Sequence, residues 1–383
     1  MYKFTEEQIM IRDMVREFTK NEVAPYDKAM DETFSFNMEI YQQIYSKLVE
    51  TGLMGIHIPE QYGGGGGDAI TSQIVVNELA KGSASIALYL DANWLASDMI
   101  LVHGNDEQKQ KYLPLAAAGK VFAFGLTEAS AGSDAAGIKS IAAKQDDGSY
   151  ILNGGKAWIT NSGVADYYLI MAKTDPEAGA RGISVFIVPK DAEGLTIGKF
   201  EHKMGMRGSA TCELSFDNIR IPECDRVGRE GLGFKVAMMA LDGARISIGS
   251  IASGLSQHAM EIAKAYANER TTFGKPIKAF QGLAFRFADM YADIKAMELL
   301  AYDAATTKDA GERCTLDAAA AKLFATEKGT QICIQAQAVF GGNGMSKEYD
   351  IERLLRDVRV WSVMEGSTEI LRMIVSGTVL AKK

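Results

Sequence analysis

Glu365 is the residue whose surroundings best suit acid–base chemistry. Gly366, Ser367 and Thr368 follow it, and apolar residues flank this short segment. Apolar neighbours desolvate a carboxylate and raise its pKa toward the range in which a base works well. Glycine also lets a ligand approach the main chain closely. A Glu-Gly pair alone is more often a helix end or a turn, so other segments must decide between these interpretations.

Two segments near the middle of the chain are suited to holding a planar ligand. Residues 124–134 form a loop of small and hydroxyl residues whose backbone donors suit a heterocycle edge or a phosphate. Trp158 and Thr160 stand two apart in an apparent strand, so ring and hydroxyl face one side. The alternatives are a strand-to-loop connector for the first segment and a core tryptophan for the second.

Each of three segments in the C-terminal part has both a functional and a structural explanation. Asp242 and Arg245 stand one turn apart, which an ion pair on a solvated helix face explains equally well. Arg270 and Phe273 end a helix, where arginine suits either a pyrophosphate or the helix dipole. The glycine-rich residues 337–344 indicate close backbone contact with a ligand or an ordinary helix C-cap.

Composition and charge exclude several classes of protein. The chain has 383 residues, enough for two or three domains, with 47% hydrophobic and 23% charged residues, as in globular proteins. A net charge of −8 argues against nucleic acid as a partner. No apolar run approaches the roughly 18 residues of a membrane span, and residues 1–20 do not resemble a signal peptide. We therefore expect a cytoplasmic protein that neither spans nor binds a membrane.

The four cysteines predict neither a metal site nor a disulfide framework. Cys212, Cys224, Cys314 and Cys333 show no C-x-x-C spacing and have no histidine nearby. Such cysteines are typical of buried free thiols in a reducing compartment.

The elements that must position these residues come in three blocks. Residues 1–120 show the 3.6-residue period of helices, residues 121–231 switch to a period of two, and residues 232–383 return to long helices. We expect a hairpin over 150–159, with its turn at 153–155. The order lacks the βαβ alternation of a Rossmann enzyme and predicts an all-α domain, an antiparallel β-domain and a helical bundle.

Taken together in this order, the segments resemble the acyl-CoA dehydrogenase family of flavoproteins. The resemblance covers essentially the whole chain, from the helical N-terminus through Pro-Glu-Gln-Tyr-Gly-Gly at 59–64 to Glu365-Gly366. It implies an α+β multidomain fold with an N-terminal all-α domain, a central antiparallel β-barrel and a C-terminal four-helix bundle. It also implies FAD as cofactor, an acyl-CoA substrate, an electron-transferring flavoprotein as acceptor and a homotetramer.

The resemblance also implies roles for individual residues. Glu365 matches the family's base, which removes the α-proton while the β-hydrogen leaves as hydride to flavin N5. Contacts with FAD fall on Phe124, Leu126, Thr127, Gly132, Ser133, Trp158, Ile159, Thr160, Arg270, Phe273, Gln281, Gln337, Gly341, Ser367, Thr368 and Glu369. Contacts with the substrate fall on Ser133, Asp242, Arg245 and Gly366, with Trp94 and Met364 in the acyl pocket.

Three residues depart from the common family pattern. Met364 replaces a frequent tyrosine, and its adaptable side chain would reshape the acyl pocket. Trp94 stands where family members often have serine, which should block a long straight chain. Asp91 stands where short-chain members have an apolar residue, although some medium-chain members carry an acid there. Asp91 is either a hydrogen-bonded carboxylate at the pocket floor or a second base.

A second base would suit a cyclic 1-enoyl-CoA, which has no α-proton for Glu365 to remove. Asp91 would take a γ-proton across the ring while hydride leaves the β-carbon, and this 1,4-elimination gives a conjugated cyclic diene. Alicyclic members of the family that act on cyclohex-1-ene-1-carboxyl-CoA have a similar pattern, so we predict this catalytic pair and substrate.

Other substrates and activities remain as alternatives to the cyclic substrate. The first is α,β-dehydrogenation of a straight short chain such as butyryl-CoA. An enoyl-CoA reductase, an acyl-CoA oxidase and a non-catalytic binding protein on the same scaffold are the others. Glu365, Arg270 and Trp158 all being in place argues against the last.

Overall fold

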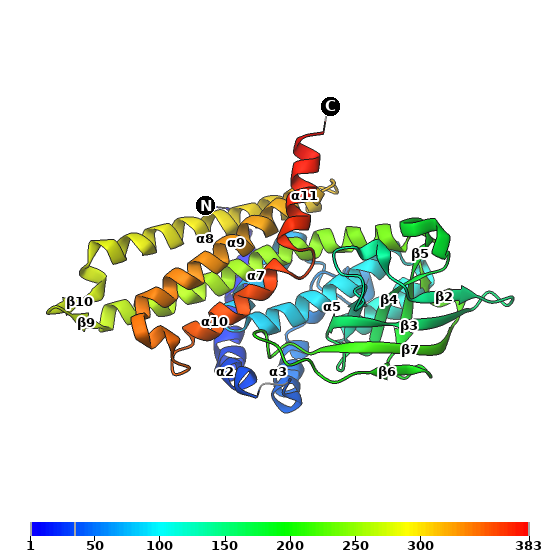
Figure 1. The fold of residues 1–383 in the computed structure, drawn as a ribbon, viewed down its shortest axis with the longest axis horizontal. Coiled ribbons are helices and arrows are strands. Elements are labelled where there is room, and N and C mark those ends of the chain that lie inside the picture. The colour runs from blue at the N-terminus through cyan, green and yellow to red at the C-terminus, as the bar shows by residue number, and fades with distance from the viewer. Residues whose placement is uncertain (1, 34–35, 382–383) are drawn as a thin grey trace.

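The computed structural model describes residues 2–33 and 36–381, in which helices, strands and helices follow one another (Figure 1). The first block contains α1 (Glu6–Phe18), α2 (Ala24–Glu32), α3 (Met38–Glu50), α4 (Ala69–Ala80), α5 (Ala84–His103) and α6 (Asp106–Ala117). Most of these helices begin where a side chain accepts a hydrogen bond from an otherwise unpaired backbone N–H. These caps are Thr5, Asn37, Asp68, Ser83 and Asn105.

Helix α5 is the central helix of the molecule. Every residue from Ala84 to Ser97 is buried. A helix that is buried all round must be covered on each side by other elements. It lies between the sheet and the long C-terminal helices (Figure 1), so its side chains can reach a site where these layers meet.

The second block is a sheet of eight strands. These are β1 (Phe122–Gly125), β2 (Ile141–Lys144), β3 (Tyr150–Thr160), β4 (Tyr167–Lys173), β5 (Ile183–Pro189), β6 (Leu195–Ile197), β7 (Thr211–Ile221) and β8 (Arg226–Val227). Their order is β6-β7-β3-β2-β4-β5-β8, with β1 beside β4.

The predicted antiparallel barrel is wrong in two respects. Strand β1 runs parallel to β4, and β2 meets β4 in parallel at Ile141 and Lys173, so the sheet is mixed. Parallel neighbours need a long connection between them. Strands β2 and β3 supply it for β1 and β4, since both lie between β1 and β4 in sequence. In the described part of the chain the end strands β6 and β8 do not pair, so the sheet is not closed.

The predicted hairpin turn at 153–155 is also wrong, because these residues lie inside the single strand β3. The two glycines there permit close approach of neighbouring strands. A Cβ at Gly154 would come within 2.6 Å of Ser140 Oγ, and one at Gly155 within 2.9 Å of Leu214 O. The actual turn, between β2 and β3, has Gly148 in the left-handed region.

The third block consists of three long helices that run side by side, α7 (Gly233–Glu269), α8 (Gln281–Asp309) and α9 (Thr315–Phe340) (Figure 1). A small hairpin of β9 (Thr271–Thr272) and β10 (Lys275–Pro276) joins α7 to α8. Helix α10 (Ile351–Val358) packs on α9, and α11 (Thr368–Val379) projects from the body. The helical first and last blocks are as predicted, whereas the limits 1–120, 121–231 and 232–383 remain predictions.

The cysteines are all free thiols. Cys212, Cys314 and Cys333 are buried as expected, but Cys224 is exposed. Within residues 2–33 and 36–381 no group of His, Cys, Asp and Glu side chains could hold a metal ion. The same residues include no helix that is both long and apolar enough to cross a membrane.

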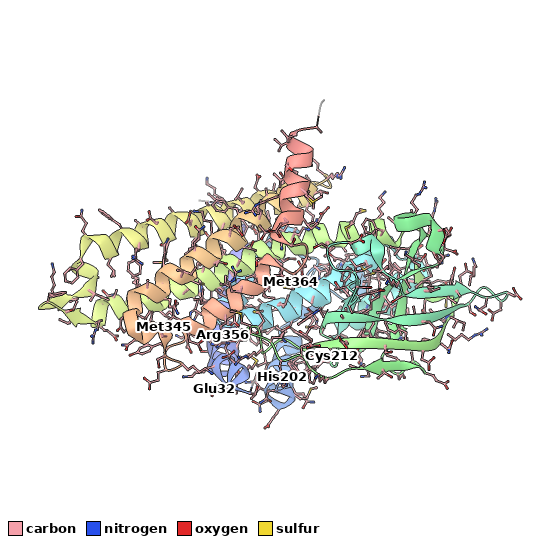
Figure 2. The ribbon with its side chains drawn as sticks, viewed as in Figure 1. Glu32, His202, Cys212, Met345, Arg356 and Met364 are labelled. Carbon is pink, nitrogen blue, oxygen red and sulfur yellow. The ribbon has the colours of Figure 1, made fainter. Side chains whose placement is uncertain are left out.

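A buried ion network joins α10 to α2. Arg353 Nη1 pairs with Asp27 and lies 3.7 Å from Asp357 Oδ2. Arg356 pairs with Asp31, and Figure 2 shows Arg356 beside the end of α2. Burial raises the pKa of Asp357 to about 7, and the Arg353 guanidinium opposes that rise. The arginine therefore compensates carboxylates that are costly to bury.

We expect Arg353→Met to lower the free energy of unfolding by about 3–5 kcal/mol, because it leaves two carboxyl groups buried without their cation. Chemical denaturation at fixed protein concentration measures the change. Arg372→Met is the matched control, since Arg372 pairs with Glu327 at the surface and its side chain is 56% exposed. That change should cost less than about 1 kcal/mol. Equal effects of the two variants would contradict a stabilising role for the network.

Candidate active site

Glu365 lies in the loop between the short 3₁₀ helix Arg359–Ser362 and α11. Its φ is 53° and that of Gly366 is 102°, so two successive residues adopt left-handed backbone. A non-glycine residue in this region is uncommon and strained, and such residues cluster at functional sites. The neighbouring Met364 lies near the centre of the molecule, between the long helices and the sheet (Figure 2).

The Glu365 carboxyl group has the properties expected of a base. Its Oε2 atom is buried and has no hydrogen-bond partner within the described residues. Burial raises the pKa of Glu365 to about 7, while the charges of Lys322 and Arg245 oppose that rise. A base with a pKa near the working pH is present in its ionised form and still accepts a proton readily.

Asp91 faces the same region from α5. It is 2% exposed, and its Oδ2 atom has no hydrogen-bond partner in residues 2–33 and 36–381. Burial raises the pKa of Asp91 well above its usual value, the charge of Glu365 raises it further, and a hydrogen bond with Ser247 lowers it. Two carboxyl groups in electrostatic contact titrate as a pair, and the negative charge of Glu365 favours the protonated form of Asp91.

Arg245 and Asp242 connect α7 to the Glu365 loop. Arg245 Nη1 donates to Asp242 Oδ1 over 2.9 Å, and its Nε donates to the carbonyl oxygen of Glu365 over 3.1 Å. The side chains are only 5% and 14% exposed, so the solvated-face interpretation of this pair is wrong. Thr315 Oγ1 also donates to Asp242 Oδ2 over 2.6 Å. Sequence reasoning missed Thr315, because it lies on another helix, far along the chain.

A buried ion pair fixes the loop after β1 against β3. Lys156 Nζ lies 2.7 Å from Glu128 Oε1 and donates to Leu126 O over 3.2 Å. Glu128 also accepts hydrogen bonds from the backbone N–H groups of Lys139 and Ser140. Burial lowers the pKa of Lys156 to about 8. Nothing in the local sequence pattern marks this pair, whose members come together only through the register of the sheet.

Trp158 stands at an irregularity in β3. The pairing of β3 with β7 shifts register between Lys156 and Ile159, and Trp158 has a φ of 60°. A bulge of this kind re-aims a side chain, and the indole is 61% exposed. The core-tryptophan interpretation is therefore wrong. An exposed ring can pack against a planar ligand. Thr160, two residues further along the strand, is half-buried.

A cavity of about 690 Å³ lies at the far end of the long helices. Its lining includes Arg270, Phe273, Phe280, Phe340 and Gly341. Phe273, in the turn of the β9–β10 hairpin, is 90% exposed. The hairpin lies at the opposite end of the bundle from α11 (Figure 1). The structure therefore brings Arg270, Phe273 and Gly341 together, but not with Glu365 of the same chain.

The other predicted site residues lie in several settings. Ser367 caps α11, and its hydroxyl accepts from the Ile370 N–H. Trp94 is buried, and its indole donates to Met54 O over 3.0 Å. Gln337 donates to Gly344 O over 3.0 Å. Exposed residues are Gly132, Ser133, Gln281 and Glu369; half-buried ones are Phe124, Thr127, Met364 and Gly366; Leu126, Ile159 and Thr368 are buried.

Three family models match the chain in order. The acyl-CoA dehydrogenase N-terminal domain matches residues 5–120, the middle domain 123–219 and the C-terminal domain 231–380. The chain belongs to the acyl-CoA dehydrogenase family. It is therefore an FAD-dependent oxidoreductase that acts on acyl-CoA thioesters.

Individual members of the acyl-CoA dehydrogenase family are similar to the chain over its whole length. The short-chain-specific acyl-CoA dehydrogenase of Clostridium acetobutylicum is 42% identical over 99% of both chains. Subunit CarC of the caffeyl-CoA reductase–Etf complex of Acetobacterium woodii is 40% identical over 99% of this chain and 100% of CarC. The solved structure of butyryl-CoA dehydrogenase from Megasphaera elsdenii superposes with a TM-score of 0.96 at 38% identity, covering 100% of both chains.

The residues present fit a flavin cofactor. The exposed indole of Trp158 offers a flat surface, and the loop after β1 is held in place by the buried Lys156–Glu128 pair. The distant cavity adds the Arg270 guanidinium, a group well shaped for a diphosphate. The individual cofactor contacts remain predictions.

Proposed function

We propose that the protein dehydrogenates short, straight acyl-CoA thioesters, with Glu365 as the base that removes the α-proton. The observation that carries the assignment is the Glu365 carboxyl group, which has a buried oxygen without a partner and a pKa of about 7. The Clostridium and Megasphaera relatives, named as short-chain and butyryl-CoA enzymes, support the straight short chain. They favour this alternative over the cyclic substrate that the sequence predicts.

The chain's own residues bind, orient and deprotonate the substrate. Glu365 Oε2 accepts the α-proton, and the Glu365 backbone N–H would donate to the thioester carbonyl, where negative charge develops. Arg245 Nε donates to the carbonyl oxygen of Glu365, in the next peptide unit, which helps to fix the orientation of the base. Bound FAD supplies the hydride acceptor for the β-hydrogen. A protonated Asp91 would leave the floor of the acyl pocket neutral, as a short apolar chain requires.

A cyclic 1-enoyl-CoA is the second candidate substrate. The observation that favours it is the Asp91 Oδ2 atom, buried and unpartnered in the described part of the chain, in electrostatic contact with Glu365. Two carboxyl groups on opposite walls are what a 1,4-elimination across a ring requires. In this reaction Asp91 would be ionised and would take the γ-proton.

Different observations support the electron acceptor and the oligomeric state. CarC, by its name, works in a complex with Etf, which supports an electron-transferring flavoprotein as the electron acceptor. The cavity at the far end of the bundle lies away from Glu365 of the same chain. A cofactor that contacts both the cavity and the Glu365 loop therefore needs a second copy of the chain to supply one of them. Helix α11 projects with Met373, Val379 and Leu380 exposed, which supports a homotetramer in which these side chains are covered.

Anaerobic titration of the yellow enzyme with a panel of acyl-CoA thioesters tests the proposal. Butyryl-CoA should bleach the flavin and give a kcat/KM at least about 10-fold above that for octanoyl-CoA, because a short pocket rejects added methylenes. Cyclohex-1-ene-1-carboxyl-CoA serves as the third compound. Bleaching by the cyclic thioester alone would favour the second candidate, and no bleaching by any thioester would exclude dehydrogenation. Turnover with oxygen or dye separates an oxidase from a dehydrogenase.

A further inference from the structure

Lys322 is buried beneath the loop that carries Glu365. It belongs to α9 and its side chain is fully buried, a rare state for lysine unless its charge is paired. Its Nζ donates to the carbonyl oxygen of Gly366 over 2.7 Å and to that of Trp361 over 3.1 Å. The two acceptors bracket residues 362–365. One ammonium group therefore holds both ends of the segment that carries the base.

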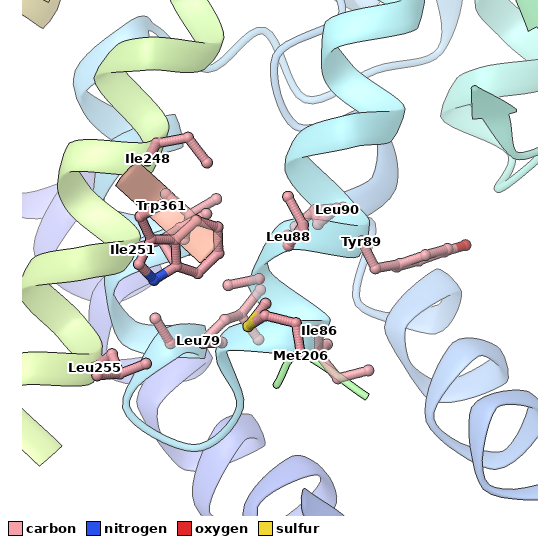
Figure 3. Close-up of a cluster of buried hydrophobic side chains, with 14 of the residues drawn as sticks. Leu79, Ile86, Leu88, Tyr89, Leu90, Met206, Ile248, Ile251, Leu255 and Trp361 are labelled. Carbon is pink, nitrogen blue, oxygen red and sulfur yellow. The ribbon is translucent and has the colours of Figure 1, made fainter. Parts of the chain in front are cut away.

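Trp361, one of these two acceptors, occupies a fixed position in the core. The Trp361 side chain is 0% exposed. Figure 3 shows its indole beside Ile248 and Ile251 of α7, with α5 on the other side. Because Trp361 cannot move without disrupting this packing, Lys322 ties Gly366 to a rigid point.

The conformation between these acceptors is strained. Glu365 and Gly366 both have positive φ, and for glutamate this state persists only where the surroundings impose it. Arg245 Nε donates to the carbonyl oxygen of Glu365 itself. The carbonyl groups of Trp361, Glu365 and Gly366 are thus each held by a buried cation.

We propose that Lys322 is a positioning residue for Glu365, which fixes the loop through two carbonyl groups and places a positive charge near the carboxylate. The inference rests on the proposed role of Glu365 as base and adds to it a residue on another helix. Lys322 touches neither substrate nor cofactor in this scheme and acts only through the loop.

The charges around Glu365 agree with this role. Burial lowers the pKa of Lys322 to about 8, and the charge of Glu365 opposes that decrease. Among the groups that lower the pKa of Glu365, Lys322 has the largest effect and Arg245 the next. Arg245 is paired with Asp242, and Asp91 faces Glu365 from α5. Lys322 is therefore the cation that most favours the ionised form of the buried Glu365.

Two substitutions of Lys322 test the proposal in the FAD-loaded enzyme. Lys322→Met removes both donors and the charge, whereas Lys322→Gln keeps an N–H donor without the charge. Lys328→Met is the matched control, because Lys328 lies on the same helix but pairs with Asp293 near the surface. The readouts are kcat and KM for the acyl-CoA that bleaches the unchanged enzyme, and the pKa of Glu365. That pKa comes from the carboxyl infrared band that disappears in Glu365→Gln.

We expect Lys322→Met to lower kcat by about 100-fold with KM nearly unchanged, as a displaced base would. Both variants should raise the pKa of Glu365, by about 1 to 3, because the nearby positive charge is lost. Lys328→Met should change neither quantity. If Lys322→Met does not fold, the pKa of Glu365 measured in Lys322→Gln tests the proposal instead.

An unchanged Glu365 pKa in a folded Lys322 variant would overturn the inference, even if kcat falls. Failure of the proposed function has a different signature. In that case no acyl-CoA bleaches the unchanged enzyme, although the infrared band of Glu365 still titrates and still shifts in the Lys322 variants.

Discussion

Replacing Glu365 with glutamine is expected to lower kcat by about 10²- to 10⁴-fold, the contribution of a positioned general base. Glutamine keeps the shape of the side chain and cannot accept the α-proton. The strained loop and the bound flavin should remain. The loop's bonds to Arg245 and Lys322 use the backbone carbonyl oxygens of Glu365, Gly366 and Trp361 rather than the Glu365 carboxyl group. Stopped-flow reduction of the flavin by butyryl-CoA measures the loss directly.

The pH dependence of flavin reduction tests the same assignment. The pKa of Glu365 is raised to about 7 by burial, and a base acts only when it is deprotonated. The rate in the unchanged enzyme should therefore rise with pH through about 7 and level off above it. Glu365→Gln should lose this rise together with the activity.

A surface carboxylate provides the control for Glu365. Glu107 is exposed in the first turn of α6, and Glu107→Gln should leave both the rate and its pH profile unchanged. Flavin content and thermal stability must match in all three proteins. A Glu365→Gln enzyme that reduces its flavin within tenfold of the normal rate would show that another group removes the proton.

Sequence patterns predicted the helical blocks because amphipathic periods reflect local burial. They failed at β3, where Gly154 and Gly155 seemed to mark a turn. Glycine also permits close approach of strands, and only the partners Ser140 and Leu214 show which use applies. The parallel pairing of β1 with β4 was missed for a similar reason, since strand direction depends on the path of the chain rather than on the strand's own residues.

The candidate site also contains residues that local sequence reveals and residues that it does not. Glu365 could be chosen from its neighbours in sequence, and a family resemblance supplied its role. Lys322, Thr315 and the pair Lys156–Glu128 could not be chosen, because each acquires its meaning from a partner on a distant element. Trp158 showed the opposite pattern: its type was informative, but only the irregularity in β3 reveals that it is exposed.

Replacing Asp91 with asparagine is expected to separate the two candidate substrates. If Asp91 removes a γ-proton from the cyclic thioester, Asp91→Asn should lower that activity by about 10²- to 10⁴-fold. Dehydrogenation of butyryl-CoA should stay within about threefold, because a protonated Asp91 and an asparagine are both neutral and similar in size. Flavin reduction by each thioester under anaerobic conditions measures both effects in one preparation.

Glu365→Gln is the counterpart that makes the comparison decisive. With butyryl-CoA, only the Glu365 substitution should slow flavin reduction. With the cyclic thioester, the Asp91 substitution should slow it at least as much as the Glu365 substitution does. Equal small effects of Asp91→Asn on both thioesters would make Asp91 a neutral part of the pocket floor. Equal large effects would point to a structural role, which thermal unfolding would reveal.

The protonation of the Asp91–Glu365 pair bears on which of the two candidate substrates the site suits. Burial and the charge of Glu365 both raise the pKa of Asp91, which favours a protonated Asp91 beside an ionised Glu365. That distribution suits removal of an α-proton by Glu365. A cyclic substrate needs the charge on Asp91, which requires Glu365 to carry the proton instead. The pH profile of cyclic turnover should therefore differ from that of butyryl-CoA and should follow the pair rather than Glu365 alone.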